Sequence, residues 1–182
     1  MLSNIYIILS AVTLATQASI LPRDWCYGGD RVAKTCYGSP NGGPQNLVVD
    51  DIVSAAVYLR SYGRSTSPPR FLTIPALGPD NCTFAVLYTY GTVAVKLKHY
   101  NFTETTSVLF EDIANAIDGG ETPTATSLER SVISCGWKGG SIGVTANATR
   151  PEYHSPEFLA SRAITDGFVV GLVGVGNPSQ PL

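Results

Sequence analysis

Apolar and polar positions follow two different periods along this chain, and each period predicts one kind of element. In residues 51–62, apolar side chains recur three and four positions apart, which is the spacing of an amphipathic helix. Asp50 is the expected N-cap of this helix, and Gly63 is the expected terminating glycine. The same spacing predicts a second helix over residues 107–118, ended by Gly119.

Between the two helices the pattern changes to strict alternation. Residues 83–90 and 93–99 are predicted to form a β-hairpin, because Gly91 and Thr92 suit a two-residue turn. One face of this hairpin is expected to be apolar and to cover a core. The turn sets a register with three opposed pairs: Tyr90 with Val93, Tyr88 with Val95, and Val86 with Leu97.

Shorter β-type segments surround these elements. Strands are predicted at residues 31–37, 71–74, 131–135 and 141–147, with the last two joined in a second hairpin. The order of elements favours an α+β fold in which two helices pack on one face of an antiparallel sheet. This is a disulfide-stabilised sandwich of the split βαβ type.

The first residues of the chain have the pattern of a targeting signal. Residues 5–16 form an apolar run followed by small residues, which indicates a signal peptide over residues 1–18. The run is short for a membrane span, which needs about 20 apolar residues, so stable membrane insertion is not expected. The predicted product is secreted and extracellular, with a folded domain over residues 19–150.

The C-terminal extension, residues 151–182, has a weaker pattern. A short helix is predicted at residues 158–164, followed by an apolar, glycine-containing stretch at residues 168–175. That stretch is either another strand of the sheet, a loosely held tail or part of a glycolipid-anchor signal.

Composition narrows the possible functions. The chain has 182 residues, of which 14% are charged, and its net charge is −2. Because no basic surplus is available to neutralise phosphates, nucleic acid is not an expected partner. The length fits one domain with a core of ordinary size.

Cysteine usage agrees with an oxidising compartment. An even number of cysteines in a secreted chain predicts two disulfides, although three connectivities are possible. No cysteine pair has zinc-site spacing, so neither a metal nor another cofactor is expected. Three sequons also predict N-glycans on the surface. The cysteines are Cys26, Cys36, Cys82 and Cys135, and the sequon asparagines are Asn81, Asn101 and Asn147.

Three segments give the chain a family resemblance. Cys82-Thr83-Phe84-Ala85-Val86 opens the predicted hairpin, Asp112-Ile113 lies in the second helix, and residues 130–147 carry Cys135 with Gly139-Gly140. In this pattern, which spans residues 50–147, the chain resembles the fungal necrosis-inducing extracellular effectors. The resemblance implies a killer-toxin-like sandwich and a non-catalytic, host-directed or cell-targeting role. It implies no active-site residues.

No catalytic motif stands out in the sequence. His99 and His154 are the candidate acid–base groups of a hydrolase, but a solvated strand end and a polar loop explain them more simply. The carboxylate pairs at residues 50–51 and 111–112 are the candidates for glycosidase chemistry. A helix cap and a solvated helix face account for these pairs, so no catalytic residue is assigned.

Aromatic residues near the cysteines are the remaining candidates for function. Trp25, Tyr27, Tyr37 and Trp137 lie in glycine-rich segments, where they either pack on the disulfides or form a rigid recognition surface. The favoured hypothesis is a secreted effector or toxin-like protein that binds an extracellular host or competitor target without catalysis. The alternatives are a secreted hydrolase and a carbohydrate-binding module.

Overall fold

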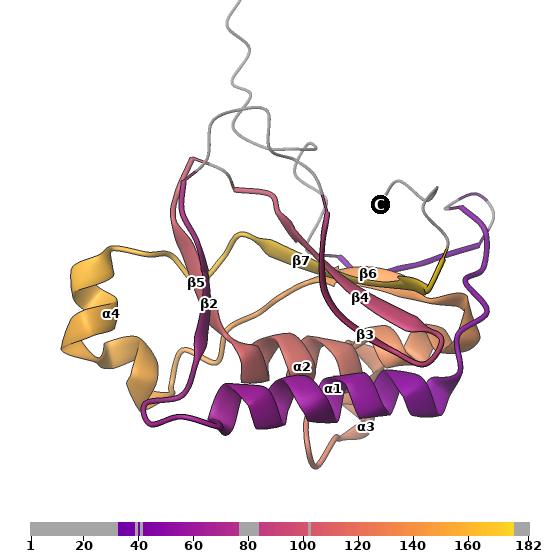
Figure 1. Cartoon of the computed structure of the whole chain (residues 1–182), viewed down its shortest axis with the longest axis horizontal. Coiled ribbons are helices and arrows are strands. Elements are labelled where there is room, and N and C mark those ends of the chain that lie inside the picture. Colours follow the sequence, from indigo (N-terminus) through magenta and orange to yellow (C-terminus); the bar gives the residue numbers. More distant parts are fainter. Residues whose placement is uncertain (1–32, 39, 41, 77–83, 102, 177–182) are drawn as a thin grey trace, which may run out of the picture.

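The protein is an α+β structure built on an antiparallel sheet (Figure 1). The computed structural model describes residues 33–38, 40, 42–76, 84–101 and 103–176. The main sheet has five strands in the order β1-β6-β7-β4-β3, and β2 pairs with β5 in a separate two-stranded sheet. The strands are β1 (Thr35–Cys36), β2 (Phe71–Ile74), β3 (Ala85–Tyr90), β4 (Val93–His99), β5 (Thr106–Leu109), β6 (Gly140–Gly143) and β7 (Phe168–Gly174).

Two helices lie side by side along one side of the main sheet (Figure 1). The space between them and the sheet holds the core, which includes Ile52, Leu59, Val95, Ile113 and Leu172. The helical elements are α1 (Val49–Arg64), α2 (Phe110–Asp118), α3 (Ala125–Glu129), η1 (Val132–Lys138), η2 (Pro151–His154) and α4 (Pro156–Ser161).

Helix α1 is longer than its apolar period predicted. Its N-cap is Val48 rather than Asp50, and no side chain caps it. Gly63 lies inside the helix and does not terminate it. A Cβ atom at position 63 would lie 2.9 Å from the Cβ of Phe110, so the glycine allows α1 and α2 to approach closely.

The β3–β4 hairpin forms around Gly91 as predicted, with Tyr90 opposite Val93 and Tyr88 opposite Val95. A bulge between Val86 and Tyr88 then shifts the register, so that Val86 faces Lys96 instead of Leu97. The predicted apolar face of β3 is therefore not all core. Because β3 is the edge strand, Val86 and Tyr90 are exposed, whereas β4 is buried along most of its length.

Two other predicted boundaries are wrong. Residues 107–109 belong to strand β5, which pairs with β2, so α2 begins only at Phe110. Residues 131–135 were expected to be a strand, but most of them lie in the 3-10 segment η1, where Gly136 and Gly139 have positive φ angles. No second hairpin joins them to residues 141–147, because β6 pairs instead with β1 and β7.

The apolar stretch near the C-terminus is a strand. β7 lies between β4 and β6, and it pairs with β4 along its whole length and with β6 over residues 169–172. Before it, α4 begins at Pro156, and its N-cap is Ser155, whose hydroxyl accepts a hydrogen bond from the Phe158 N–H. Of the three interpretations of residues 168–175, the additional strand is the one that the structure contains.

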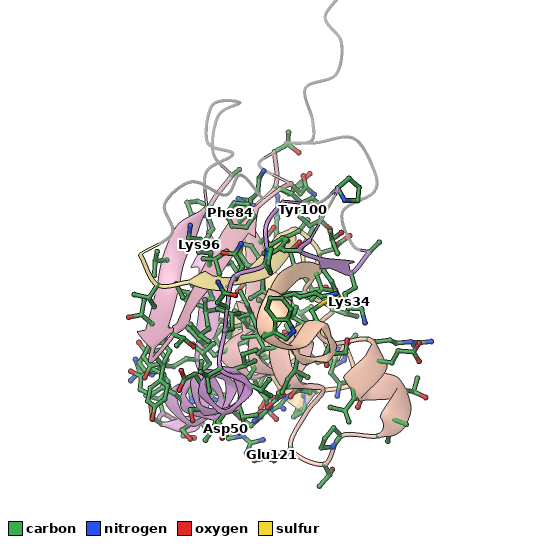
Figure 2. The ribbon with its side chains drawn as sticks, turned by 90° about the vertical axis from the view of Figure 1, so that its right-hand side faces the viewer. Lys34, Asp50, Phe84, Lys96, Tyr100 and Glu121 are labelled. Atoms are coloured by element: carbon green, nitrogen blue, oxygen red, sulfur yellow. A yellow bond between two sulfur atoms is a disulfide. The ribbon has the colours of Figure 1, made fainter. Side chains whose placement is uncertain are left out.

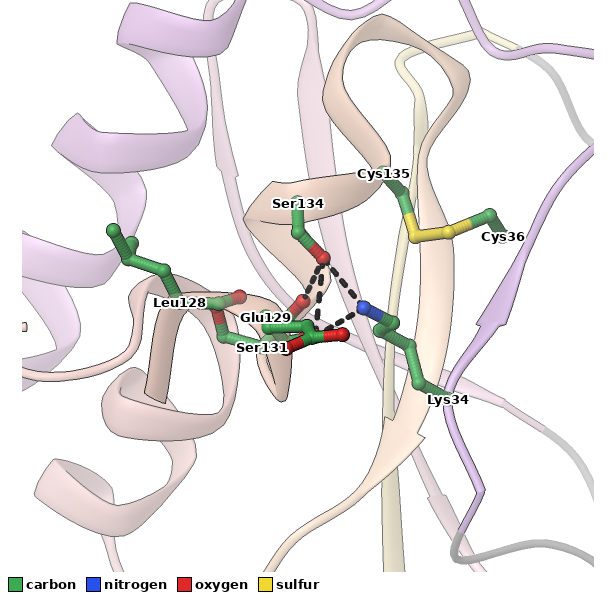
Figure 3. The surroundings of a disulfide bond; sticks show 7 residues. All are labelled: Lys34, Cys36, Leu128, Glu129, Ser131, Ser134 and Cys135. Atoms are coloured by element: carbon green, nitrogen blue, oxygen red, sulfur yellow. Dashed lines mark hydrogen bonds between the residues drawn. A yellow bond between two sulfur atoms is a disulfide. The ribbon is translucent and has the colours of Figure 1, made fainter. Parts of the chain in front are cut away.

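One disulfide joins β1 to η1, with 5.3 Å between the Cα atoms of Cys36 and Cys135 (Figure 3). Beside it, the Lys34 ammonium donates hydrogen bonds to the Glu129 carbonyl and, at 2.6 Å, to the Ser134 hydroxyl. Cys26 and Cys82 lie outside the described residues, as does the predicted signal peptide. Among the described helices, none has the length and hydropathy of a membrane span.

Candidate interaction surface on helix α1

Helix α1 is unusually poor in charge for a helix at the molecular surface. Between Asp51 and Arg64, its only charged side chain is Arg60. The Arg60 residue is 4% exposed and its guanidinium lies 2.8 Å from the buried carboxylate of Asp118. The solvent-facing side of α1 is therefore uncharged for about three turns.

Large apolar side chains fill this uncharged stretch. We call Val53, Val57, Tyr58 and Tyr62 the α1 surface, and their exposed fractions are 40%, 50%, 45% and 37%. In the sequence, Val53 and Val57 widen the apolar stripe of the helix, but in the structure both are exposed and lie outside the core. A helix that is apolar all round is normally buried on all sides. A contiguous exposed apolar area of this kind is typical of an interaction site.

A groove runs along one flank of the α1 surface. It has a volume of about 360 Å³, and its α1 side is formed by Val53 and Val57 together with Arg60, Ser61 and Arg64. Pro123 and Leu128, from the segment around α3, line the opposite side. Leu128 is itself 37% exposed. The groove extends the apolar area beyond the helix and gives it a concave part that can receive a side chain.

Aromatic rings lie on the other flank of the α1 surface. The Tyr58 ring stacks on the Tyr88 ring of β3 with 3.9 Å between centroids and 5° between planes. The Tyr62 ring lies nearly parallel to that of Tyr58, at 6.3 Å. The guanidinium of Arg70 lies over Tyr62, 4.4 Å from its centroid. These contacts fix the tyrosine rings, so they lose little entropy on binding a partner.

The N-terminal end of α1 is clamped to the β3–β4 turn. The Asp51 carboxylate accepts hydrogen bonds from the Thr92 N–H and from its hydroxyl, both at 2.8 Å. The Thr92 hydroxyl also accepts a hydrogen bond from the Val48 N–H. Asp51 is thus a tie between two elements rather than one half of a catalytic pair. Asp50, by contrast, is exposed at the helix end that faces the viewer in Figure 2.

A chain of ion pairs holds the C-terminal end of α1. The guanidinium of Arg64 lies 2.6 Å from the carboxylates of Glu111 and Glu121, and Arg150 also contacts Glu111, at 2.7 Å. Hydrogen bonds from Arg64 lower the pKa of Glu111. Glu111 was expected on a solvated face, but it is the centre of this network and only 12% of its side chain is exposed.

The other predicted chemical groups have structural contacts. His99 is buried, with its Nε2 atom 2.9 Å from the Thr106 hydroxyl, and is not at a solvated strand end. Asp112 is also buried and accepts a hydrogen bond from the Tyr153 hydroxyl. Burial raises the pKa of Asp112. His154 is exposed and its Nε2 atom lies 2.8 Å from the Ala148 carbonyl oxygen.

Of the four aromatic residues singled out in the sequence, the two in the described part of the chain differ in exposure. Tyr37 is 4% exposed and packs with Ala94 and Val173. Trp137 is 50% exposed, whereas Trp25 and Tyr27 lie outside the described residues. The α1 surface was missed, although the sequence carries a signal for it: between Asp51 and Arg64 the helix has no charged residue except Arg60.

Two of the three sequons fall in the described part of the chain. The Asn147 side chain is exposed and its carbonyl accepts hydrogen bonds from the N–H and the hydroxyl of Thr149. Asn101 is half-buried and accepts a hydrogen bond from the Thr103 hydroxyl. Asn81 lies outside the described residues. Glycosylation at these positions stays a prediction.

No group of three or more histidine, cysteine or carboxylate side chains that could hold a metal occurs among the described residues. Comparison with protein-family models, curated proteins and solved structures gave no match.

Proposed function

We propose that this chain is a secreted, non-catalytic effector or toxin-like protein that binds a protein target through the α1 surface. The observation that carries the proposal is the exposure of Val53, Val57, Tyr58 and Tyr62 on a helix with no exposed charge between its ends. Secretion is supported by the apolar N-terminal run and by the Cys36–Cys135 disulfide, because disulfides persist in oxidising compartments. The sandwich of the killer-toxin-like effectors is the fold relationship that we propose.

The arrangement of the tyrosines favours a protein over a carbohydrate as the partner. A sugar stacks on an uncovered ring face, but Tyr58 and Tyr88 cover a face of each other, and Arg70 covers a face of Tyr62. The Tyr62 ring also packs edge-on against Phe110, so each of these rings already has at least one aromatic or cationic neighbour. Immobilised tyrosines beside apolar side chains are typical of the centres of protein–protein interfaces.

The experiment compares two apolar-to-acidic substitutions. Val57→Glu places a charge in the α1 surface, and the matched control Leu159→Glu alters an α4 side chain that is 61% exposed. Purified proteins are infiltrated into plant tissue and applied to competing yeast cells, with cell death and growth inhibition as the readouts. The wild type and the control should be active, whereas Val57→Glu should lose at least about tenfold in potency, as for a hot-spot residue.

Two further measurements make the result decisive. Circular dichroism and thermal unfolding must show that both variants are folded, so that a loss of potency reports on binding. A panel of hydrolase substrates is assayed in parallel with a His154→Ala variant. Full potency in a folded Val57→Glu protein would contradict the role of the α1 surface. Substrate turnover that disappears in His154→Ala would favour the hydrolase alternative.

A further inference from the structure

A second hollow, separate from the α1 surface, lies between the β2–β5 ribbon and α4. Its volume is about 510 Å³ and it is lined mainly by apolar atoms. The rings of Phe71 and Phe158 form its wall, with 5.2 Å between their centroids. Behind them, the buried ring of Tyr153 packs edge-on against both. The aromatic wall is thus supported from beneath, which favours a pocket that exists before a ligand binds.

Hydroxyl groups around this pocket are already used in local hydrogen bonds. The Ser155 hydroxyl accepts from the Phe158 N–H, and the Ser161 hydroxyl donates to the Phe158 carbonyl. The hydroxyls of Thr73 and Ser107 lie 2.7 Å apart and bond to each other. These bonds use part of the hydrogen-bonding capacity of each hydroxyl, so the pocket offers a neutral polyol fewer polar partners than its composition indicates.

The rim of the pocket is acidic. Glu152 and Glu157 are among its lining residues, and these residues include no lysine or arginine. Arg150 lies 2.7 Å from Glu111 but 3.3 Å from Glu152, so Glu152 is the weaker partner of a shared guanidinium. The hydrogen bond from Arg150 lowers the pKa of Glu152.

We propose that this pocket binds a small organic cation with an apolar body, of the aralkylammonium class. The phenylalanine wall accommodates the apolar body, and the faces of aromatic rings attract a cation. The carboxylates of Glu152 and Glu157 complement its charge at the rim. The proposal does not depend on the α1 surface, because the two sites share no lining residue.

The test uses benzyltrimethylammonium as the probe and benzyl alcohol as its uncharged counterpart. Each is titrated into the intact mature protein while aromatic ring resonances are followed by nuclear magnetic resonance. The cation should shift the signals of Phe71 and Phe158 saturably, and should bind at least about tenfold more tightly than the alcohol, as expected for a carboxylate-assisted cation site.

Variants that remove carboxylates distinguish the effect of charge inside the pocket from the effect of the protein's net charge. Glu152→Gln combined with Glu157→Gln should weaken binding of the cation by about tenfold. Glu121→Gln removes a carboxylate from the far end of the same ion-pair chain, outside the pocket, and should leave the affinity unchanged. Phe158→Leu should also weaken binding, since it removes one ring of the wall while keeping an apolar side chain.

Three results would overturn the proposal: equal affinities for the cation and the alcohol, no saturable shift at Phe71 and Phe158, or an equal loss in Glu121→Gln and in the double variant. Each is independent of the potency assay for Val57→Glu. Failure of the pocket would therefore leave the proposed function intact, and failure of the α1 surface would leave the pocket intact.

Discussion

The two faces of helix α1 are both apolar, but they differ in size and use. The inner face sets Ile52 and Leu59 beside the small residues Ala55, Ala56 and Gly63, and the small residues allow close packing against α2 and the sheet. The outer face carries Val57, Tyr58 and other large side chains, which remain exposed. The difference shows that hydrophobicity alone does not identify the core. Only the face whose side chains pack against α2 and the sheet is buried on folding.

The comparison predicts that the two faces respond differently to substitution. Changes that disturb the inner face should reduce the free energy of unfolding, whereas changes on the outer face should leave stability nearly unchanged and reduce binding. The substitutions below test this division, beginning with the largest expected effect.

The largest effect is expected from removal of the Cys36–Cys135 disulfide, which holds η1 where it contacts both α1 and α2. A bridge that closes a loop of this length contributes about 2–5 kcal/mol. Cys135→Ser should therefore lower the free energy of unfolding and the protease resistance together, as measured by denaturant titration and limited proteolysis. A variant as resistant to protease as the wild type would show that η1 keeps its position against α1 and α2 without the disulfide.

The disulfide framework also predicts the state of the remaining cysteines. If all four cysteines pair, the connectivity left after Cys36–Cys135 is Cys26 with Cys82. Thiol labelling of the native protein should then modify none of them, and peptide mapping should recover the Cys26–Cys82 peptide. Ready labelling of either residue would contradict the prediction of two disulfides.

Neighbouring residues of α1 give the most direct comparison of its two faces. Ile52 is fully buried and Val53 is 40% exposed. Ile52→Ala should lower the free energy of unfolding by about 2–5 kcal/mol, because it leaves a cavity. Val53→Ala should change it by less than about 0.5 kcal/mol, as at other surface positions. Chemical denaturation measures both free energies of unfolding. Similar losses of stability in the two variants would contradict the difference between the two faces of α1.

Gly63 tests how closely the inner face packs. Replacing an exposed glycine in a helix by alanine usually stabilises the protein by about 1 kcal/mol. Here the added methyl group meets Phe110, so Gly63→Ala should instead cost about 1–2 kcal/mol. Ser61→Ala, on the exposed side of the same helix, is the matched control and should be neutral or slightly stabilising. Stabilisation by Gly63→Ala would show that the helices can separate at no cost.

The smallest effect concerns Glu111 and its dependence on pH. Its pKa is lower in the folded protein than its ordinary value of 4.5, so ionised Glu111 stabilises the fold above pH 4.5. That contribution is lost as the pH falls through the lower, folded-state pKa. At pH 7, Glu111→Gln should cost about 1 kcal/mol. Thermal unfolding should show the difference from wild type shrinking towards acidic pH, and a constant difference would exclude this linkage.

The sequence predicts correctly those elements that are determined by residues close together in the chain. The β3–β4 hairpin depends on Gly91 and on alternation, and α1 depends on its apolar period, so both were predicted correctly in kind. β2 at residues 71–74 was also predicted as a strand. The α+β class follows from these elements.

Elements that depend on distant partners could not be predicted in the same way. Residues 106–109 continue the apolar pattern of α2, and only pairing with β2 makes them a strand. The burial of His99 and Asp112 arises from contacts across the fold, with Thr106 and Tyr153. The α1 surface was overlooked because the periodicity shows which positions of the helix are apolar. It does not show which of these side chains are covered by other elements in the folded protein.

The position of β7 has a consequence for the order of folding. β4 and β3 form one hydrogen-bonded pair and β1 and β6 form another, and β7 is the strand that joins them. Since β7 is the last strand of the described chain, a polypeptide still being synthesised holds two separate sheet fragments until residues 168–174 emerge. Completion of the sheet is thus a late, long-range event, which slows folding and leaves strand edges open to chaperones meanwhile.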